Sequence, residues 1–379
     1  MCLCLPLAAQ MHRYSLGFTV SEQDFADTID IEFEHHRILV PIEIQGKKYR
    51  FMFDTGCTQG VIFDSNPIPY IKEVGNVVSF DISNLKDTVC VVQLPAFRLG
   101  KMVVDGYLVT RERGGVVSRG YDGIIGFDLI NKGLACKIDV ENKRLILTDR
   151  KKFFAQERGY EVKYKLQAFV PYVWVSPFMR HMDRAIFDTG STQLYSMNRE
   201  SFQKHVYKSR QVAAQVEGRA VGQHLIGMNG VERTDTVYFL AMERLKWDKF
   251  SLRDYHTVTN EGSSYIGTGL LDHGSIIINP FKKRIIFQPN TKTDEMTISN
   301  EQPQMMIVPM KGRPVVGLVR EESAAYKNGM RRGDAILKID DRDIPTIAAY
   351  MQFSFVKGNT YTFTVQNEQG KIKTVQITK

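Results

Sequence analysis

Apolar and polar side chains alternate from Arg37 to Thr58, in the stretch RILVPIEIQGKKYRFMFDTGCT. Alternation with a period of two is typical of a half-buried β-strand, and a glycine between two such runs favours a turn. We therefore predict a β-hairpin that turns at Gly46. A second stretch, Phe169–Thr192, follows the same plan with a longer turn and ends in IFDTGST. The alternating positions of the first stretch are Ile42, Ile44, Tyr49, Phe51 and Phe53.

A second pair of similar segments follows the first pair. Asp122–Asp149 resembles Ser263–Pro289 when Gly126 is aligned with Gly267. The offset is 134 residues at the Asp-Thr-Gly sequences and 141 at these later segments. Two blocks that recur in the same order at nearly one offset indicate an internal duplication. Each repeat is rich in Val, Ile, Phe and Tyr, so both are predicted to be β units, with one helix over Ser196–Tyr207.

The composition of the chain changes after the second repeat. The sequence NTKTDEMTISNEQPQ is polar, which is typical of a linker. A third unit follows it, with a strand, a short helix, a Gly-containing turn and further strands. We therefore expect an N-terminal segment (1–29), lobe 1 (30–150), lobe 2 (160–289), a linker (290–304) and a C-terminal unit (305–379).

Composition narrows the functional classes. The chain has 379 residues and a formal net charge of +8, with the basic residues scattered, so a nucleic-acid partner is not expected. No run of about 18 apolar residues suggests a transmembrane segment. The five cysteines fit neither a zinc site nor a disulfide framework. The adjacent His35 and His36 would point to opposite faces of a strand, so no metal and no other cofactor is predicted.

The N-terminal sequence MCLCLPLAAQ resembles the end of a secretory signal, with a cleavage point near LAAQ. It lacks a preceding Lys or Arg, and its apolar stretch is short. An apolar chain end or a misassigned start are the alternatives. The expectation is an extracytoplasmic protein, either periplasmic or secreted.

Asp54 and Asp188 each follow an apolar strand and precede Thr-Gly. One such sequence would be an ordinary turn, since Asp and Gly both favour turns. Two copies on repeated units can meet near a pseudo-two-fold axis and place two carboxyl groups side by side. Such a pair cannot easily hold two negative charges, so it shares a proton and supplies a general base and a general acid. Gly56 and Gly190 would permit the close approach.

The chain thus resembles a retropepsin-type aspartic protease duplicated in one polypeptide, with a C-terminal PDZ domain of bacterial type. The residues that carry the resemblance are FDTGCT with GIIGFDLI, FDTGST with YIGTGLL, and SAAYKNGMRRGDAILKID. It implies a mainly β, bilobal, pepsin-like fold with a small α+β PDZ domain. It also implies an aspartic endopeptidase. By this resemblance Asp54 and Asp188 are the catalytic pair, supported by Thr55, Gly56, Thr189, Gly190 and Ser191.

The resemblance implies further roles and is incomplete in places. Thr55 and Thr189 would brace the two loops, and Ser191 would donate to the outer oxygen of Asp188. Cys57 stands where lobe 2 has Ser191, and a thiol is a weak donor. Two hairpins are candidates for flaps over a substrate, at 77–94 and 216–237. The usual carboxylate-binding loop of a PDZ domain is not visible, so peptide capture and simple packing both stay open for that unit.

The expected partner is a peptide or protein substrate, bound by a monomer with an intramolecular site. The alternative from another class is an inactive peptide-binding or scaffold protein on a protease fold. A dimer, in which each lobe works with another molecule, is a third interpretation. A glycosidase also uses two carboxylates, but the paired Asp-Thr-Gly turns disfavour it.

Overall fold

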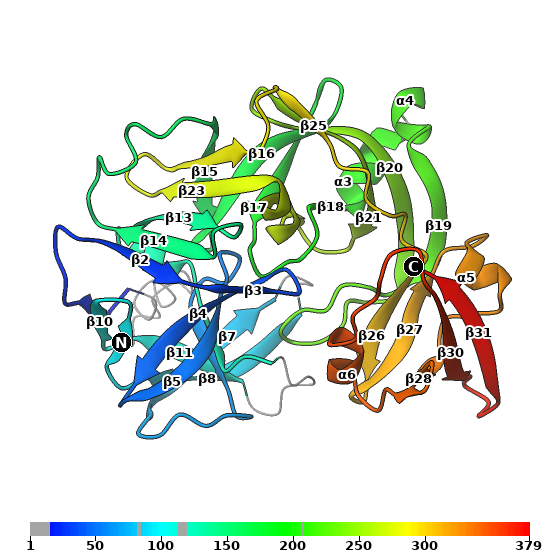
Figure 1. Cartoon of the computed structure of the whole chain (residues 1–379), viewed down its shortest axis with the longest axis horizontal. Coiled ribbons are helices and arrows are strands. Elements are labelled where there is room, and N and C mark those ends of the chain that lie inside the picture. Colours follow the sequence, from blue (N-terminus) through cyan, green and yellow to red (C-terminus); the bar gives the residue numbers. More distant parts are fainter. Residues whose placement is uncertain (1–15, 82–84, 113–119, 207) are drawn as a thin grey trace, which may run out of the picture.

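A computed structural model describes residues 16–81, 85–112, 120–206 and 208–379 (Figure 1). The predicted mainly β, bilobal architecture is confirmed. The predicted signal-like segment lies outside the described residues, as do 82–84 in the first flap candidate. None of the helices within the described part of the chain is long and apolar enough to cross a membrane.

Lobe 1 is built on one strongly curved sheet with the order β1-β10-β9-β4-β5-β12-β6-β11-β8-β7, and β3 is added beside β4. The predicted hairpin is β4 and β5, which pair in antiparallel register from Leu39↔Met52 to Ile44↔Lys47. The strands are β1 (Thr19–Val20), β3 (Glu32–Glu34), β4 (Arg37–Ile44), β5 (Lys47–Phe53), β6 (Gly60–Phe63), β7 (Lys72–Phe80), β8 (Lys86–Gln93), β9 (Phe97–Leu99), β10 (Met102–Asp105), β11 (Leu108–Glu112) and β12 (Gly123–Ile125), followed by helix α2 (Asp128–Asn131).

Lobe 2 contributes most of a second sheet, with the order β19-β20-β21-β18-β22-β17-β16-β15-β24-β23-β13-β14-β2 and with β25 beside β21. Its strands are β15 (Tyr160–Gln167), β16 (Val170–Phe178), β17 (His181–Phe187), β18 (Tyr195–Asn198), β19 (Val216–Gly222), β20 (Asp235–Trp247), β21 (Phe250–Asn260), β22 (Ser264–Ile266), β23 (Gly274–Asn279), β24 (Arg284–Pro289) and β25 (Glu295–Thr297). Its helices are α3 (Arg199–Val206), α4 (Arg210–Ala213) and the 3-10 helix η1 (Thr268–His273).

The two lobes have the same strand order around their Asp-Thr-Gly turns. Lobe 1 runs β12-β6-β11-β8-β7, and lobe 2 runs β22-β18-β21-β20-β19. In both, the strand after the turn lies parallel to a later strand, β6 with β11 and β18 with β21. The hairpin β7–β8 is therefore the topological counterpart of β19–β20.

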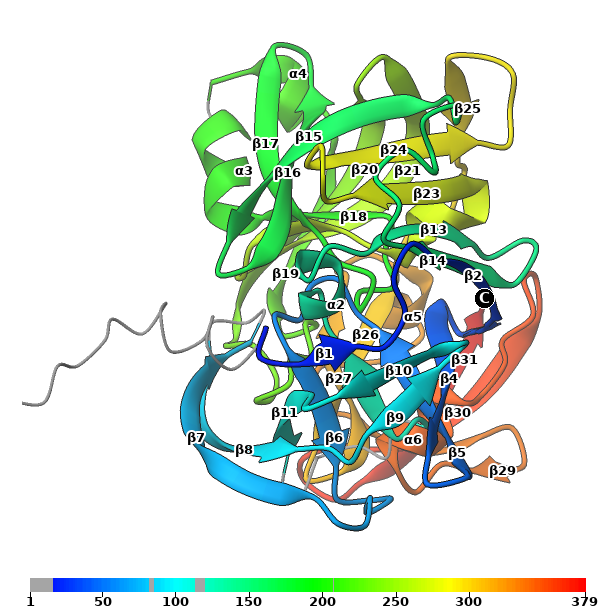
Figure 2. The ribbon, with the colours of Figure 1, turned by 90° about the vertical axis from the view of Figure 1, so that its left-hand side faces the viewer.

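A shared strand pair joins the lobes. From lobe 1, β13 (Ala135–Asp139) pairs with β23 of lobe 2 through Cys136↔Ile278 and Lys137↔Ile277. The offset of 141 residues in the sequence maps Cys136 onto Ile277 and Lys137 onto Ile278, so each pair is the two-fold image of the other. β14 (Arg144–Thr148) and β2 (Ala26–Asp30) extend the sheet below β23 and β24 (Figure 2). Buried side chains from both lobes form one continuous core.

Two predicted boundaries differ from the structure. The segment 1–29 supplies β1 and most of β2, because Ala26–Asp30 pairs with β14. The predicted linker contains β25, which pairs in parallel with β21 from Ser251↔Glu295 to Arg253↔Thr297. Backbone pairing with an available edge thus orders segments whose side chains carry no strong apolar signal.

The predicted helix over Ser196–Tyr207 is α3, which begins three residues later. Ser196 and its neighbours belong to β18, and Asn198 accepts a hydrogen bond from the Ser201 amide at 2.8 Å. That bond is a typical N-terminal cap. Phe202 is buried on the inner face of the helix. Tyr207 lies outside the described residues.

The C-terminal unit is a small α+β structure with its own core. Its sheet has the order β26-β27-β28-β30-β31, with β29 beside β28. It docks against lobe 2, because β27 lies beside β19 and the Gln223 amide donates to the Gly317 carbonyl at 3.0 Å (Figure 1). The elements are β26 (Met305–Met310), β27 (Arg313–Val319), α5 (Ala324–Lys327), β28 (Ala335–Ile339), β29 (Arg342–Asp343), α6 (Ile347–Met351), β30 (Thr360–Gln366) and β31 (Ile372–Thr378).

Candidate active site

Asp54 and Asp188 begin the turns that follow β5 and β17. Each strand lies parallel to a later strand of its own lobe, β5 with β12 and β17 with β22. The Asp54 amide donates to the Ile125 carbonyl at 2.9 Å, and the Asp188 amide donates to the Ile266 carbonyl at 2.8 Å. The last residue of each later strand, Ile125 in β12 and Ile266 in β22, therefore fixes the backbone position of one aspartate.

Thr55 and Thr189 lock the two turns together. The Thr55 hydroxyl donates to the Phe187 carbonyl at 2.7 Å and accepts from the Thr189 amide at 3.0 Å. The Thr189 hydroxyl donates to the Phe53 carbonyl at 2.7 Å and accepts from the Thr55 amide at 3.0 Å. Both side chains are buried, so these four bonds do not compete with water. The turns are thus held in fixed relative positions.

Gly56 and Gly190 bring each turn against the opposite carboxyl group. Their amides donate to Asp54 Oδ1 at 2.8 Å and to Asp188 Oδ1 at 2.9 Å. A β-carbon on Gly56 would lie 2.3 Å from Asp188 Oδ1, and one on Gly190 would lie 2.4 Å from Asp54 Oδ2. Both distances are far below van der Waals contact, so only glycine fits at either position.

The two carboxyl groups lie close together, because each is in contact with the glycine of the opposite turn and each shifts the pKa of the other. Burial raises the pKa of the Asp54 carboxyl, although the neighbouring Asp188 carboxyl and the Gly56 amide oppose the rise. Burial, followed by the charge of Asp54, raises the pKa of Asp188 well above its ordinary value. The pair therefore holds one proton over a wide pH range, and it titrates as a unit.

Cys57 and Ser191 occupy equivalent positions but have different partners. The Cys57 thiol donates to the Gln59 carbonyl at 2.9 Å, and burial raises its pKa well above the usual value. It is therefore a buried neutral thiol and not a nucleophile. The Ser191 amide donates to the Asp188 carbonyl at 3.2 Å. No hydrogen bond among the described residues joins the Ser191 hydroxyl to the Asp188 carboxyl group, so that donation stays a prediction.

Apolar side chains flank the aspartate pair on both sides. Met52 and Ile186 stand two residues before Asp54 and Asp188, so they project from the same face of the sheet as the carboxyl groups. Their cross-strand neighbours complete two buried clusters. The lobe 1 wall is Leu39, Met52, Val61, Phe63, Tyr121 and Ile124, and the lobe 2 wall is Val170, Tyr172, Ile186 and Tyr265.

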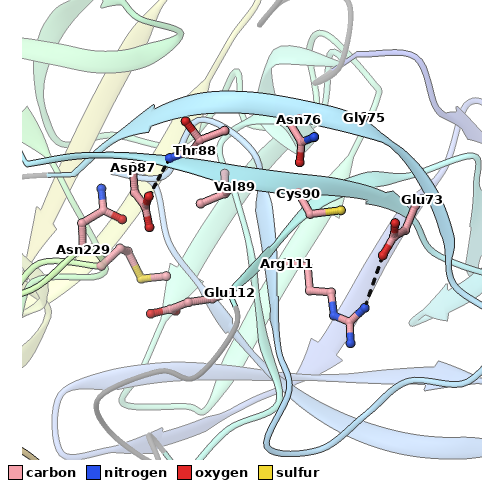
Figure 3. Close-up of a pocket in the computed structure, with 11 residues that line it drawn as sticks. Glu73, Gly75, Asn76, Asp87, Thr88, Val89, Cys90, Arg111, Glu112 and Asn229 are labelled. Carbon is pink, nitrogen blue, oxygen red and sulfur yellow. Dashed lines mark hydrogen bonds and ion pairs between the residues drawn. The ribbon is translucent and has the colours of Figure 1, made fainter.

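The two flap candidates meet each other. Asp81, directly after β7, accepts a hydrogen bond from the Asn229 amide at 2.9 Å. The Asn229 side chain donates to the Leu85 carbonyl at 2.9 Å. A cavity of about 460 Å³ lies beside this contact, between β7, β8, β11 and Asn229 (Figure 3). Its lining comes mostly from polar residues of lobe 1, is completed by Met228 and Asn229 of lobe 2, and does not include the aspartate pair.

A buried pair behind the lobe 1 turn is absent from the sequence prediction. The Tyr107 hydroxyl donates to Asp128 Oδ1 at 2.8 Å, and neither side chain is exposed. The Gly60 and Leu129 amides also face this carboxyl group. Burial raises the pKa of Asp128 to about 8. The signal in the sequence is an acidic residue inside the apolar run GIIGFDLI.

Asp128→Asn is expected to change the pH dependence of stability. An acid with a raised folded pKa favours the neutral form, so the fold loses stability as pH rises from about 4 to about 8. Asparagine is neutral throughout and still accepts from Tyr107. The wild-type Tm should therefore fall between pH 6 and pH 9 by at least about 3 °C more than that of the variant. Parallel curves, measured beside the exposed control Asp105→Asn, would contradict this assignment.

The described residues contain no group of three or more His, Cys, Asp or Glu side chains arranged to hold a metal ion. His36 Nδ1 lies 3.3 Å from Asp272 Oδ2, where the β3–β4 turn of lobe 1 reaches η1 of lobe 2.

No family model and no curated protein matches the chain. A search of solved structures finds a similarity to the crystal structure of the aspartic proteinase from Irpex lacteus. The TM-score is 0.45 and the sequence identity is 12%, over 71% of this chain and 100% of that chain.

Proposed function

We propose that this protein is an aspartic endopeptidase with a single intramolecular active site formed by Asp54 and Asp188. The observation that carries the proposal is the reciprocal bracing of two Asp-Thr-Gly turns, one from each lobe, which holds the half-buried Asp54 and the buried Asp188 close together. An isolated turn would not require this arrangement. Both turns come from one chain, which supports a site that does not depend on dimerisation.

The pair has the protonation pattern that peptide hydrolysis needs. Asp54, as the carboxylate, accepts a proton from a water molecule held between the two groups, and the water oxygen attacks the peptide carbonyl carbon. Asp188 gives its proton to the carbonyl oxygen, so that a neutral tetrahedral diol forms. Collapse of the diol transfers a proton to the leaving amine and breaks the C–N bond. The two aspartates then share one proton again.

The pH profile of cleavage should have two limbs. One carboxyl group of the pair must be ionised, so activity falls when the pH drops below the first titration of the pair. The other must keep its proton, so activity falls when the pH rises above the second titration. The expected optimum is acid to mildly acid.

The substrate is an extended peptide. The walls on either side of the aspartates are apolar, so they favour large apolar side chains near the scissile bond. The C-terminal unit resembles a PDZ domain, whose role here would be peptide or partner binding. Its docking on β19 also supports a role within the protease.

The test is incubation with a mixed peptide library at several pH values, with products identified by mass spectrometry. Cleavage next to apolar residues, absent from the Asp54→Asn/Asp188→Asn double variant, is expected. Peptide binding without cleavage at any pH would contradict an endopeptidase and favour the inactive scaffold. Equal activity per molecule at high dilution, with a monomeric mass, would separate the intramolecular site from a dimeric one.

A further inference from the structure

The loop between β19 and β20 reaches across the two apolar walls. Leu225 is buried against the lobe 2 wall, in one cluster with Val170, Tyr172, Ile186 and Tyr265. Met228 is partly buried and packs against the lobe 1 wall. This loop of lobe 2 therefore places one apolar side chain against the wall of each lobe.

The spacing of these two residues places the loop over the aspartates. Leu225 and Met228 are three residues apart, so their Cα atoms are at most about 11 Å apart. Met52 stands two residues before Asp54, and Ile186 stands two residues before Asp188. A segment that touches both walls within this span crosses the space between them, where the carboxyl groups lie. A peptide substrate would need the same space.

Hydrogen bonds within lobe 2 fix the conformation of this loop. Glu232, which is buried, accepts hydrogen bonds from the amides of His224 at 2.8 Å and Leu225 at 2.9 Å. His224 Nε2 lies 2.8 Å from the Thr259 carbonyl oxygen. The Gly227 amide donates to the Gly230 carbonyl at 2.8 Å, which closes the tip. The conformation that carries Leu225 is thus built into the fold.

The C-terminal unit holds the base of the same loop. The Gln223 amide donates to the Gly317 carbonyl of β27. A β-carbon on Gly222 would lie 2.3 Å from that carbonyl oxygen, so the two backbones are in close contact. Leu318 is fully buried in a cluster with apolar residues of β19, β20 and β21. Movement of the C-terminal unit would therefore pull directly on the residue before His224.

We propose that residues 223–230 are a built-in plug of the peptide cleft, held in place by the C-terminal unit. Leu225 and Met228 occupy the sites on the two walls where apolar side chains of a peptide would bind. The peptide therefore enters only when the plug moves away. The proposal rests on the proposed function for the identity of the cleft. A partner that draws β27 away from β19 would open the cleft, so the C-terminal unit acts as the latch.

The plug is tested by a binding measurement that needs no turnover. The probe is a fluorescein-labelled synthetic peptide that copies residues 223–230, added to proteins that all carry Asp188→Asn. In the parent protein, residues 223–230 compete with the probe for the cleft, so only the fraction of molecules with an open cleft binds the probe. The Leu225→Ser/Met228→Ser variant should bind the probe at least about tenfold more tightly than the parent. Val221→Ser, an exposed change on β19, is the matched control and should bind like the parent.

The latch is tested by amide hydrogen exchange. Gly222→Ala should make the His224 and Leu225 amides exchange at least about tenfold faster, with the Tm used to show that the lobes stay folded. Ile372→Ser, exposed on the far strand β31, should leave these rates unchanged.

Equal probe affinity in the parent and the plug variant, or no binding to either, would overturn the plug. Unchanged exchange in Gly222→Ala would overturn the latch. Tighter probe binding by the plug variant, with no cleavage by any form that retains both aspartates, would leave the plug standing and remove the proposed function.

Discussion

Asp188→Asn is expected to lower kcat/KM for peptide cleavage at least about 10³-fold, since general acid–base catalysis contributes roughly 10²–10⁴-fold and both roles are lost together. Asparagine has the same shape and still accepts from the Gly190 amide, so the turn should keep its structure. It cannot give a proton to the carbonyl oxygen. The substitution also removes the carboxyl group with which Asp54 shares a proton, so the pair no longer supplies both a base and an acid.

Asp54→Asn should have an effect of the same size, because the pair acts as a unit. The double variant should therefore be little worse than either single variant. Asp105→Asn is the control, since Asp105 is exposed at the end of β10 and only accepts from its neighbour Gly106. The measurement is kcat/KM on a peptide found in the library, together with the Tm of each variant. Full activity in either single variant would refute a shared site.

Thr189→Val is expected to be the most damaging change that leaves both aspartates in place. Valine has nearly the same shape as threonine but neither donates nor accepts. The Phe53 carbonyl and the Thr55 amide would both lose their partner in a buried setting. Each unsatisfied group costs about 1–3 kcal/mol, so the free energy of unfolding of the lobes should fall by about 2–5 kcal/mol.

Activity should fall as well, by about 100-fold, because the two carboxyl groups would no longer be held in register. Thr374→Val is the matched control. Thr374 is exposed on β31 of the C-terminal unit, and such a surface change is expected to stay within about 0.5 kcal/mol. A Thr189→Val variant as stable as this control would show that the bracing bonds contribute little.

The sequence predicts those parts of the fold that local patterns determine. The hairpin of β4 and β5 follows from the alternating apolar positions on either side of Gly46, from Ile42 to Phe53, and α3 follows from the polar–apolar pattern around Phe202. The meeting of Asp54 and Asp188 was inferred from the repeat, because equivalent turns on two related units approach a common axis. The resemblance then supplied the roles of the flanking threonines.

Other features depend on backbone geometry that side-chain patterns do not carry. The pairing of β25 with β21 uses amide and carbonyl groups, which are the same in every residue. The loop of Leu225 and Met228 fills the two walls through contacts between distant segments, so its sequence alone predicts only a flexible hairpin end.

The antiparallel pair of β13 and β23 has a consequence for any attempt to separate the halves. Cutting the connection between β14 and β15 would leave a nicked molecule whose fragments remain associated, because the pair and the common core do not depend on chain continuity. A half produced alone would end in an unsatisfied strand edge. Two identical halves can satisfy that edge by pairing with each other through a two-fold axis. The single chain thus keeps within one molecule an association that separate halves would reach only as homodimers, at a rate set by their concentration.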